Sequence, residues 1–327
     1  MEKYKWGILT AGKMSAKFVK ALRLLENAEL YAVAARDETR AKAFAGEYGF
    51  RKFYSDYESL AKDPDVDIIY IASPHSHHFD HAMLCLRNRK AVLCEKAFSL
   101  NSREAEQIIA EAHRQKTFLM EALWPPFQPM YRKTLSILKS GEPGKLIHLD
   151  ARFGFQPPYD PADRKFNISL GGGSLLDIGI YPVNDVLYFM GMPDSVTAKA
   201  LFTESGTEHT INIIFEYKDG RMATVHSSFR TMAGIGCTLY CEKGNLVFSR
   251  ARDMSQRLGV AMNGMEAREE SLIPDGMGYH FEAAEVMKCL DEGRIESDIV
   301  PHSHTLNLMK LLDMVRKSAG IVFPGRD

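Results

Sequence analysis

Apolar and polar positions alternate in a regular way along the first 120 residues. Five short runs are continuously apolar and have strand character: residues 5–10, 30–35, 67–72, 91–95 and 118–122. Between them apolar side chains recur at helical spacing, as in Phe18, Ala21, Leu22 and Leu25. Continuous apolar strands that alternate with helices predict a parallel sheet covered on both faces. The sequence therefore predicts a doubly wound α/β domain.

The pattern changes after Trp124-Pro125-Pro126. A helix is expected over residues 130–138 and is followed by five strand-like runs: residues 147–155, 196–202, 210–217, 222–228 and 237–241. The link at residues 217–220 predicts a hairpin turn, which indicates an antiparallel or mixed sheet. Two helices close the chain. We therefore expect one domain over residues 1–122 and an α+β domain over residues 123–327.

Composition and charge limit the class of function. The 327 residues carry 41 Lys and Arg against 42 Asp and Glu, so the net charge of −1 argues against a basic nucleic-acid groove. No apolar run approaches the roughly 20 residues that a membrane-spanning helix needs. Five cysteines and a polar first segment indicate reduced thiols in a cytoplasm. We expect a cytoplasmic protein whose partner is a small molecule.

The first strand runs into a turn that has the context of a dinucleotide site. The turn reads Thr10-Ala11-Gly12-Lys13-Met14-Ser15, and only Gly12 of the three fingerprint positions is glycine. Glycine would let the backbone approach a pyrophosphate at the following helix N-terminus, beside Thr10, Lys13 and Met14. An ordinary turn of another doubly wound fold remains an equal alternative on this local pattern.

The end of the second strand bears on the cofactor. Arg36 stands 24 positions after Gly12 and is followed by Asp37. An acid at the strand end would bind the ribose hydroxyl of NAD, whereas an arginine accommodates the 2′-phosphate of NADP. Arg40, one helical turn later, adds positive charge. We expect NADP rather than NAD; the alternative is that Arg36 only begins a solvated helix.

Several motifs together resemble the Gfo/Idh/MocA oxidoreductase family. They are Glu95-Lys96 after a buried strand and the segment GGGSLLDIGIY at residues 171–181. Residues 32–37, 92–96 and 120–124 look closest to the dimeric dihydrodiol dehydrogenase branch, which also includes D-xylose 1-dehydrogenase. That branch places a small hydroxyl residue at the first fingerprint position, as Thr10 does here.

The resemblance implies an N-terminal Rossmann domain and a C-terminal domain with an open-faced mixed sheet. It also implies an NADP-linked dehydrogenase of cyclic diols or pyranose sugars, such as trans-dihydrodiols or D-xylose, and a homodimer. Ser73, Pro74, His78 and Glu95 lie in segments that line the cofactor in the family. Two alternatives stay open: a keto-sugar reductase of the same family, and a non-catalytic NADP-binding sensor.

Two positions depart from the family pattern. The usual Glu-Lys-Pro is Glu95-Lys96-Ala97 here, and without the ring of proline the loop that holds Lys96 is expected to be looser. Many sugar-ring members carry histidine where this chain has Tyr181. Tyrosine is found there in the dihydrodiol and glucose-fructose oxidoreductase branches.

The candidate catalytic residues are Lys96, Asp177 and Tyr181. Lys96 follows a buried strand, where ligands bind in doubly wound sheets, although a lone lysine there is usually only a solvated charge. Asp177 and Tyr181 are four apart and share a face if the segment is helical. Pro182 then marks a kink or a new helix start. The glycines before this segment are expected to leave room for a ligand.

A proton-transfer role suits Tyr181. A tyrosine is a poor base at neutral pH unless a nearby ammonium, here Lys96, favours the phenolate. Asp177 would orient the substrate or Lys96. The alternative is that Lys96 is the base and Tyr181 only contacts the substrate.

A metal site is not predicted. His75, His77, His78 and His81 have spacings that suit a metal, but no cysteine or carboxylate partner lies at a matching spacing.

Substrate contacts and assembly are the remaining expectations. Four residues are candidates for contacting the substrate: Trp124, Phe155, Arg164 and Phe166. In residues 211–215, strand alternation places Ile211, Ile213 and Phe215 on one face and Asn212 and Ile214 on the other. An open-faced sheet of such strands needs cover, so we expect an isologous dimer through this sheet.

Overall fold

The computed structural model describes residues 3–251 and 254–326 and divides the chain into two compact units. The first comprises Met1–Trp124 and Asp275–Leu306, and the second comprises Pro125–Pro274 and Asn307–Asp327. The predicted ranges were 1–122 and 123–327, so the first unit additionally contains Leu123, Trp124 and the returning segment Asp275–Leu306. This segment packs there because Leu119 N–H donates to Ile295 O and Tyr4 O–H donates to Asp291.

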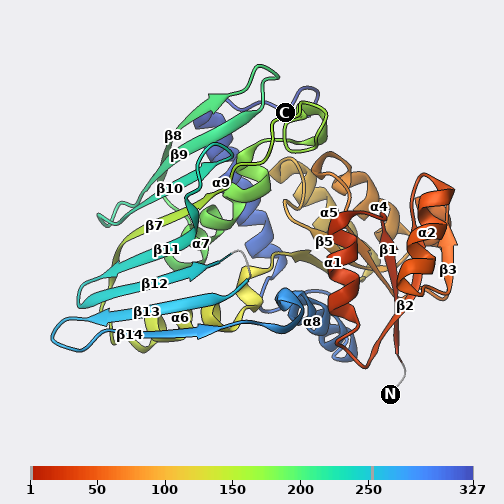
Figure 1. The fold of residues 1–327 in the computed structure, drawn as a ribbon, viewed down its shortest axis with the longest axis horizontal. Coiled ribbons are helices and arrows are strands. Elements are labelled where there is room, and N and C mark those ends of the chain that lie inside the picture. Colours follow the sequence, from red (N-terminus) through yellow and green to blue (C-terminus); the bar gives the residue numbers. More distant parts are fainter. Residues whose placement is uncertain (1–2, 252–253, 327) are drawn as a thin grey trace. The chain divides into compact units, whose positions relative to one another are not determined.

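The first unit is built on a six-stranded parallel sheet, as predicted. Its strand order is β3-β2-β1-β4-β5-β6, and every neighbouring pair is parallel (Figure 1). The strands are β1 (Tyr4–Leu9), β2 (Ala28–Ala34), β3 (Lys52–Tyr54), β4 (Ile68–Ile71), β5 (Ala91–Glu95) and β6 (Leu119–Ala122). The strand order reverses between β1 and β4, which is where doubly wound folds bind ligands.

Four of the connecting helices lie where the apolar periodicity predicted them: α1 (Lys13–Leu22), α2 (Glu38–Tyr48), α4 (His78–Arg87) and α5 (Ser102–Gln115). The short α3 (Tyr57–Lys62) also connects strands, and α8 (Tyr279–Asp291), a predicted late helix, belongs to the segment that returns to this unit. Asn101 caps α5 by accepting from Glu104 N–H, and Glu104 in turn accepts from Leu100 N–H. The short elements β3 and α3 were not predicted, because three and six residues carry too little periodicity. No helix within the described ranges is long and apolar enough to span a membrane.

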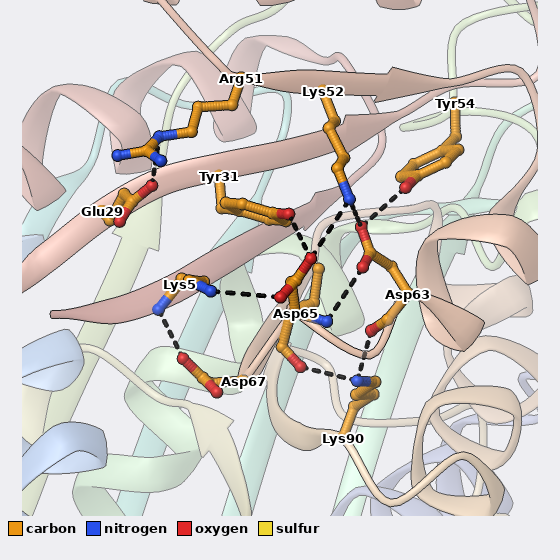
Figure 2. A network of polar contacts seen from close by, with 11 residues as sticks. Lys5, Glu29, Tyr31, Arg51, Lys52, Tyr54, Asp63, Asp65, Asp67 and Lys90 are labelled. Atoms are coloured by element: carbon orange, nitrogen blue, oxygen red, sulfur yellow. Dashed lines mark hydrogen bonds and ion pairs between the residues drawn. The ribbon is translucent and has the colours of Figure 1, made fainter. Parts of the chain in front are cut away.

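A network of polar side chains ties the amino ends of the parallel strands together (Figure 2). Lys52 Nζ lies 3.1 Å from Asp63 Oδ2, and Tyr54 O–H donates to the same oxygen. Although burial opposes ionisation, these bonds hold the pKa of Asp63 below its usual value. The buried Lys90 donates to the main-chain oxygens of Asp63 and Val66. The amino edge is thus closed by the protein's own groups, which leaves the opposite, carboxyl edge for a ligand.

The second unit contains an eight-stranded mixed sheet with the order β14-β13-β12-β11-β7-β10-β9-β8. Figure 1 shows these strands from β8 at one edge to β14 at the other, and only β7 and β10 pair in parallel. The strands are β7 (Leu146–Gly154), β8 (Ser195–Phe202), β9 (Glu208–Glu216), β10 (Met222–Ser228), β11 (Gly234–Cys241), β12 (Gly244–Arg250), β13 (Gln256–Met262) and β14 (Arg268–Leu272). The predicted fold class is confirmed; β12 to β14 were not predicted.

The helices of this unit cover one face of the sheet. They are α6 (Pro129–Ser140), α7 (Ile180–Met190) and α9 (His302–Ala319), whose first residues belong to the first unit. As predicted, Ile211, Ile213 and Phe215 are fully buried, whereas Ile214 on the other face is 41% exposed. The uncovered face therefore keeps apolar side chains in solvent.

Three buried carboxyl groups lie in the first unit near the end of β5. Tyr70 O–H donates to Glu95 Oε1 at 2.5 Å. Burial raises the pKa of Glu121 to about 8, with a contribution from Glu95 that Lys96 opposes. Burial and Glu95 also raise the pKa of Glu282 well above its usual value. Glu121 therefore holds its proton at neutral pH, and its surroundings favour the protonated form of Glu282 as well.

We expect Glu121→Gln to stabilise the protein at alkaline pH. Between an unfolded pKa of about 4.5 and the folded value of about 8, only the unfolded chain loses this proton. Stability then falls by up to about 1.4 kcal/mol per pH unit through this window. An amide cannot ionise, so the melting temperature of the variant relative to wild type should rise from pH 5 to pH 8.

Thermal melts at several pH values measure this difference, with Glu266→Gln on the surface as the matched control that shows none. An equal loss of stability at pH 5 and pH 8 in the Glu121 variant would show that the folded carboxyl is ionised.

Candidate functional site

The glycine turn lies between β1 and α1, at the carboxyl edge of the parallel sheet. Gly12 is the N-cap of α1 and provides no capping side chain. A Cβ on Gly12 would meet only Thr10 Oγ1, at 3.8 Å, so packing within the chain does not require glycine here. Lys13 is exposed and Met14 half-buried at the first helical positions. The open space above a helix N-terminus fits a pyrophosphate.

Thr10 adopts a conformation that normally favours glycine. Its φ is 98°, a value that side chains rarely take. Two bonds hold it there: its hydroxyl donates to Ala72 O at 2.9 Å, and its N–H donates to Ala34 O at 3.1 Å. A small hydroxyl residue thus replaces the fingerprint glycine and joins the ends of β1 and β4.

Two arginines gather at the carboxyl end of β2. Arg36 is exposed at the start of the loop, and Arg40 Nε donates to Ala11 O at 2.9 Å, which fixes Arg40 against the glycine turn. Asp37, the acid at this strand end, caps α2 because its Oδ1 accepts from Arg40 N–H at 2.7 Å. The carboxylate is therefore engaged by the helix, whereas the guanidinium groups present positive charge.

Sequence reasoning did not place Tyr57 and His81 in this cluster. The charges of Arg36 and Arg40 oppose the rise that burial causes in the pKa of Tyr57. The Tyr57 and His81 rings meet edge to face at 4.7 Å. Burial, with His77, His78 and Arg36 adding to it, lowers the pKa of His81 to about 4. No local pattern could have identified these partners, because they come from α3 and α4.

His78 joins the loops that follow β4 and β5. Its Nδ1 lies 2.7 Å from Ala97 O and its Nε2 lies 2.8 Å from Ser73 O. Burial lowers the pKa of His78 to about 4, so the ring is neutral and donates from one nitrogen only. Pro74 separates Ser73 from the short helix His75–His77, so the predicted cofactor-lining segment is held at the carboxyl edge.

Lys96 extends from the end of β5. Glu95 is buried, Lys96 is half-buried, and the four residues 97–100 are buried. The ammonium is close enough to lower the pKa of His78 and to oppose the rise in the pKa of Glu121. The strand end thus presents one cation above protonated or hydrogen-bonded carboxyl groups.

The second unit carries Asp177 and Tyr181 on a continuous helical segment. A π-helical turn (Leu175–Gly179) leads without a break into α7, so Pro182 lies inside a continuous helix, just after the change from π-helical to α-helical geometry, and the expected new helix start is not found. Asp177 is buried, and its Oδ1 accepts from Arg164 Nη1 at 3.0 Å. This ion pair joins a predicted substrate contact to a predicted catalytic residue. Lys96 belongs to the other unit.

The glycines before this segment serve packing within the chain. A Cβ on Gly172 would come within 2.8 Å of the backbone oxygens of Arg164 and Asn167. Gly173 has a φ of 126°, and its Cβ would collide with the carboxyl group of Glu208. Glu208 itself accepts from Leu175 N–H at 2.6 Å. The expectation that these glycines leave room for a ligand is therefore wrong for Gly172 and Gly173.

An aromatic cluster lies beside Tyr181. The centroid of the Phe153 ring lies 5.7 Å from that of the Tyr181 ring and 6.2 Å from that of the Phe155 ring. Phe155 and Phe166 meet through Phe229, with centroid distances of 5.5 and 5.4 Å. A cavity of about 260 Å³ opens against Phe166 and Phe229. The structure thus brings two predicted substrate residues together in one apolar wall.

Trp124 lies in the first unit. Its ring is 3% exposed, and its Nε1–H donates to Met277 O at 2.9 Å. Tyr279 at the start of α8 is its ring neighbour at 6.4 Å. Tyr279 was not predicted, because it is far from Trp124 in the sequence.

Two family profiles match the chain. The profile described as "Oxidoreductase family, NAD-binding Rossmann fold" matches residues 4–123. The profile described as "GFO/IDH/MocA C-terminal domain" matches residues 131–247.

Solved structures of a dehydrogenase and a ketoreductase share the fold at low identity. Levoglucosan dehydrogenase in complex with NADH and levoglucosan has a TM-score of 0.88 at 17% identity, over 98% of this chain and 97% of that chain. A 3-ketoreductase from Actinomadura kijaniata in complex with NADP and TDP-benzene has a TM-score of 0.87 at 22% identity, over 97% and 98%.

Sequence relatives cover the whole chain at higher identity. The trans-1,2-dihydrobenzene-1,2-diol dehydrogenase of Xenopus laevis is 36% identical over 331 residues, which are 98% of this chain and 99% of the relative. The human enzyme of the same name is 35% identical over 340 residues, 98% of each. The resemblance found in the motifs is confirmed. The chain is an oxidoreductase that belongs to the Gfo/Idh/MocA family and contains its NAD-binding Rossmann domain.

Proposed function

We propose that this protein is an NADP-dependent dehydrogenase of cyclic diols or pyranose sugars, with trans-dihydrodiols and D-xylose-like sugars as the substrate class. The names of the relatives at 35–36% identity support a cyclic diol as the substrate. The observation that carries the proposal is the helical segment on which Tyr181 follows Asp177, whose buried carboxylate is paired with the half-exposed Arg164. A sensor without catalysis has no need of such a proton-transfer set.

The arginines at the end of β2 support NADP. A guanidinium pairs with two phosphate oxygens, and Arg36 and Arg40 present two such groups. Asp37 accepts from Arg40 N–H and is engaged as a helix cap. Gly12 provides the open approach to the N-terminus of α1. We assign Thr10, Gly12, Lys13 and Met14, with Ser73, Pro74, His78 and Glu95, to the cofactor site.

The cofactor, when bound, would accept or return a hydride. The chain must then handle the hydroxyl proton, and Tyr181 is assigned this transfer. A phenol is a weak base at neutral pH, so a positive charge must favour the phenolate, and Lys96 is assigned that role. In the opposite direction, as a keto-sugar reductase, Tyr181 would donate the same proton. Asp177 and Arg164 would orient substrate hydroxyls beside the apolar side chains of Phe155 and Phe166, and Trp124 of the first unit is assigned as a further substrate contact.

Cofactor preference is the first test. NADP should bind more tightly than NAD, and Arg36→Ala should lose about tenfold or more in NADP affinity, since a charge-assisted phosphate bond contributes roughly 1.5–3 kcal/mol. Its NAD affinity should stay as in wild type. Fluorescence titration of both reduced cofactors measures this. Equal or tighter NADH binding in the wild-type protein would overturn the assignment.

Loss of the phenol is the second test. Tyr181→Phe should keep NADP affinity and lower kcat by roughly 10²–10⁴, which is the usual contribution of general acid–base catalysis. Lys96→Met should lose similar activity. Asp177→Asn should change KM more than kcat. The substrate for these assays is identified by screening dihydrodiols, xylose, glucose, inositol and anhydro-fructose, with turnover monitored by NADPH fluorescence.

The pH profile of kcat/KM distinguishes the two candidate bases. Tyr181→Phe should remove the ionisation of the base if tyrosine is that base, and should leave it in place if Lys96 is. Near wild-type kcat in both the Tyr181 and Lys96 variants would exclude this mechanism and favour the sensor.

The open face of the second unit's sheet supports a homodimer. Ile214, Met222, Tyr240 and Val247 lie on this face and are each 37–43% exposed. We expect light scattering to give about 74 kDa, twice the 36.8 kDa of one chain. Ile214→Glu should dissociate the dimer, because it buries a charge. Met265→Glu, in the β13–β14 turn, is the control. A wild-type mass near 37 kDa at micromolar concentration would contradict the dimer.

A further inference from the structure

A guanidinium lies against the Tyr181 ring. Arg250 is the last residue of β12, and its guanidinium carbon is 5.9 Å from the centroid of the Tyr181 ring. Phe153 on β7 contacts the same ring. All three residues belong to the second unit. The phenol assigned to proton transfer is therefore held between groups of its own sheet, one of which carries a permanent positive charge.

Asp185 is the anionic neighbour of this guanidinium. It lies one helical turn beyond Tyr181 on α7, so both project from the same face. Tyr131 O–H on α6 donates to Asp185 Oδ1 at 2.9 Å, and Asn184 Nδ2 donates to Tyr131 Oη at 3.1 Å. Burial raises the pKa of Asp185 to about 7, against the opposing effects of Tyr131 and Arg250. Near pH 7 only part of the Asp185 population is charged.

The other ionisable groups of this region are either paired with an opposite charge or protonated at neutral pH. Asp177, which lies on the same helical segment as Tyr181, is paired with Arg164. Burial raises the pKa of Tyr131 on α6 and of Cys237 on β11 well above their usual values, so both stay protonated. Lys96 is carried by the other unit. Arg250, beside the Tyr181 ring, and Asp185, one helical turn beyond Tyr181, are thus two groups of opposite charge in its own unit.

On the basis of the proposed function of Tyr181, we propose that Arg250 is a positioning residue that orients the Tyr181 ring and stabilises its phenolate, and that Asp185 limits this stabilisation through its own negative charge. A cation near a phenol favours the ionised form, and a nearby carboxylate disfavours it. A guanidinium near an aromatic ring also restrains the orientation of the ring. The two residues should therefore have opposite effects on the ionisation of the Tyr181 phenol.

The pH profile of kcat/KM tests this opposition. Arg250→Gln should shift the ionisation assigned to Tyr181 upward by roughly one pH unit, with about a tenfold loss of activity below it. Asp185→Asn should shift the same ionisation downward and raise activity on the acid side, and its amide oxygen can still accept from Tyr131. Arg250→Lys should restore part of the loss.

Controls separate this effect from loss of structure. Arg257→Gln on β13 removes an arginine that is 59% exposed, and it should leave the profile unchanged. Ultraviolet titration of tyrosine phenolate, compared with Tyr181→Phe, follows the ionisation without turnover. NADP affinity should be unchanged in the Arg250 and Asp185 variants, because both residues act on the phenol.

Different failures have different meanings. If Tyr181→Phe keeps the ionisation in the profile, the proposed function of Tyr181 fails. If Tyr181→Phe removes it but Arg250→Gln leaves it in place, only the role of Arg250 is overturned. Shifts in the same direction in Arg250→Gln and Asp185→Asn would also overturn the proposal, since loosened packing would then explain both.

Discussion

The candidate cofactor edge depends on hydrogen bonds that tie strand-end loops to one another. The Thr10 hydroxyl donates to Ala72 O across the ends of β1 and β4, and His78 lies between Ser73 O and Ala97 O, after β4 and β5. These three loops carry the glycine turn, the segment predicted to line the cofactor, and Lys96. Loops that were free to move separately could not hold one ligand, so the tie between them is the constraint from which the geometry of the site follows.

Burial controls which groups carry charge. Removal from water raises the pKa of Glu121 to about 8 and those of Glu208 and Asp185 to about 7. The carboxylate of Asp177 instead keeps a partner in Arg164. Because charges interact more strongly where the surroundings are less polar, neutralising the other carboxyl groups leaves the remaining charges with greater influence on a bound substrate. The same physical effect underlies both the pH dependence of stability predicted for Glu121 and the role proposed for Asp185 beside Tyr181.

The fold was predictable where the sequence has a clear period. Continuous apolar runs gave the parallel sheet, and the alternation at Ile211 and Ile213 gave the buried face of the second sheet. β14 was not predicted because four of its five residues are polar. β12 and β13 do carry an alternation, with Leu246 and Phe248 buried in one and Leu258 and Val260 in the other, but it was not identified as strand pattern in the sequence. Arg250 was not predicted either, since its place beside Tyr181 follows from the pairing of β12 with its neighbouring strands.

The sequence by itself determined the local features: the turn around Gly12, the arginine at the end of β2, the lysine after β5 and the helical segment that carries Asp177 and Tyr181. Each depends on residues within a few positions of one another, where strand and helix periods act directly. Only the tertiary structure decided which distant groups meet: the return of the segment Asp275–Leu306 to the first unit, the need for glycine at position 173, and the approach of Arg250 to Tyr181 across 69 positions. Such contacts follow from sheet register and shared burial, which no local pattern encodes.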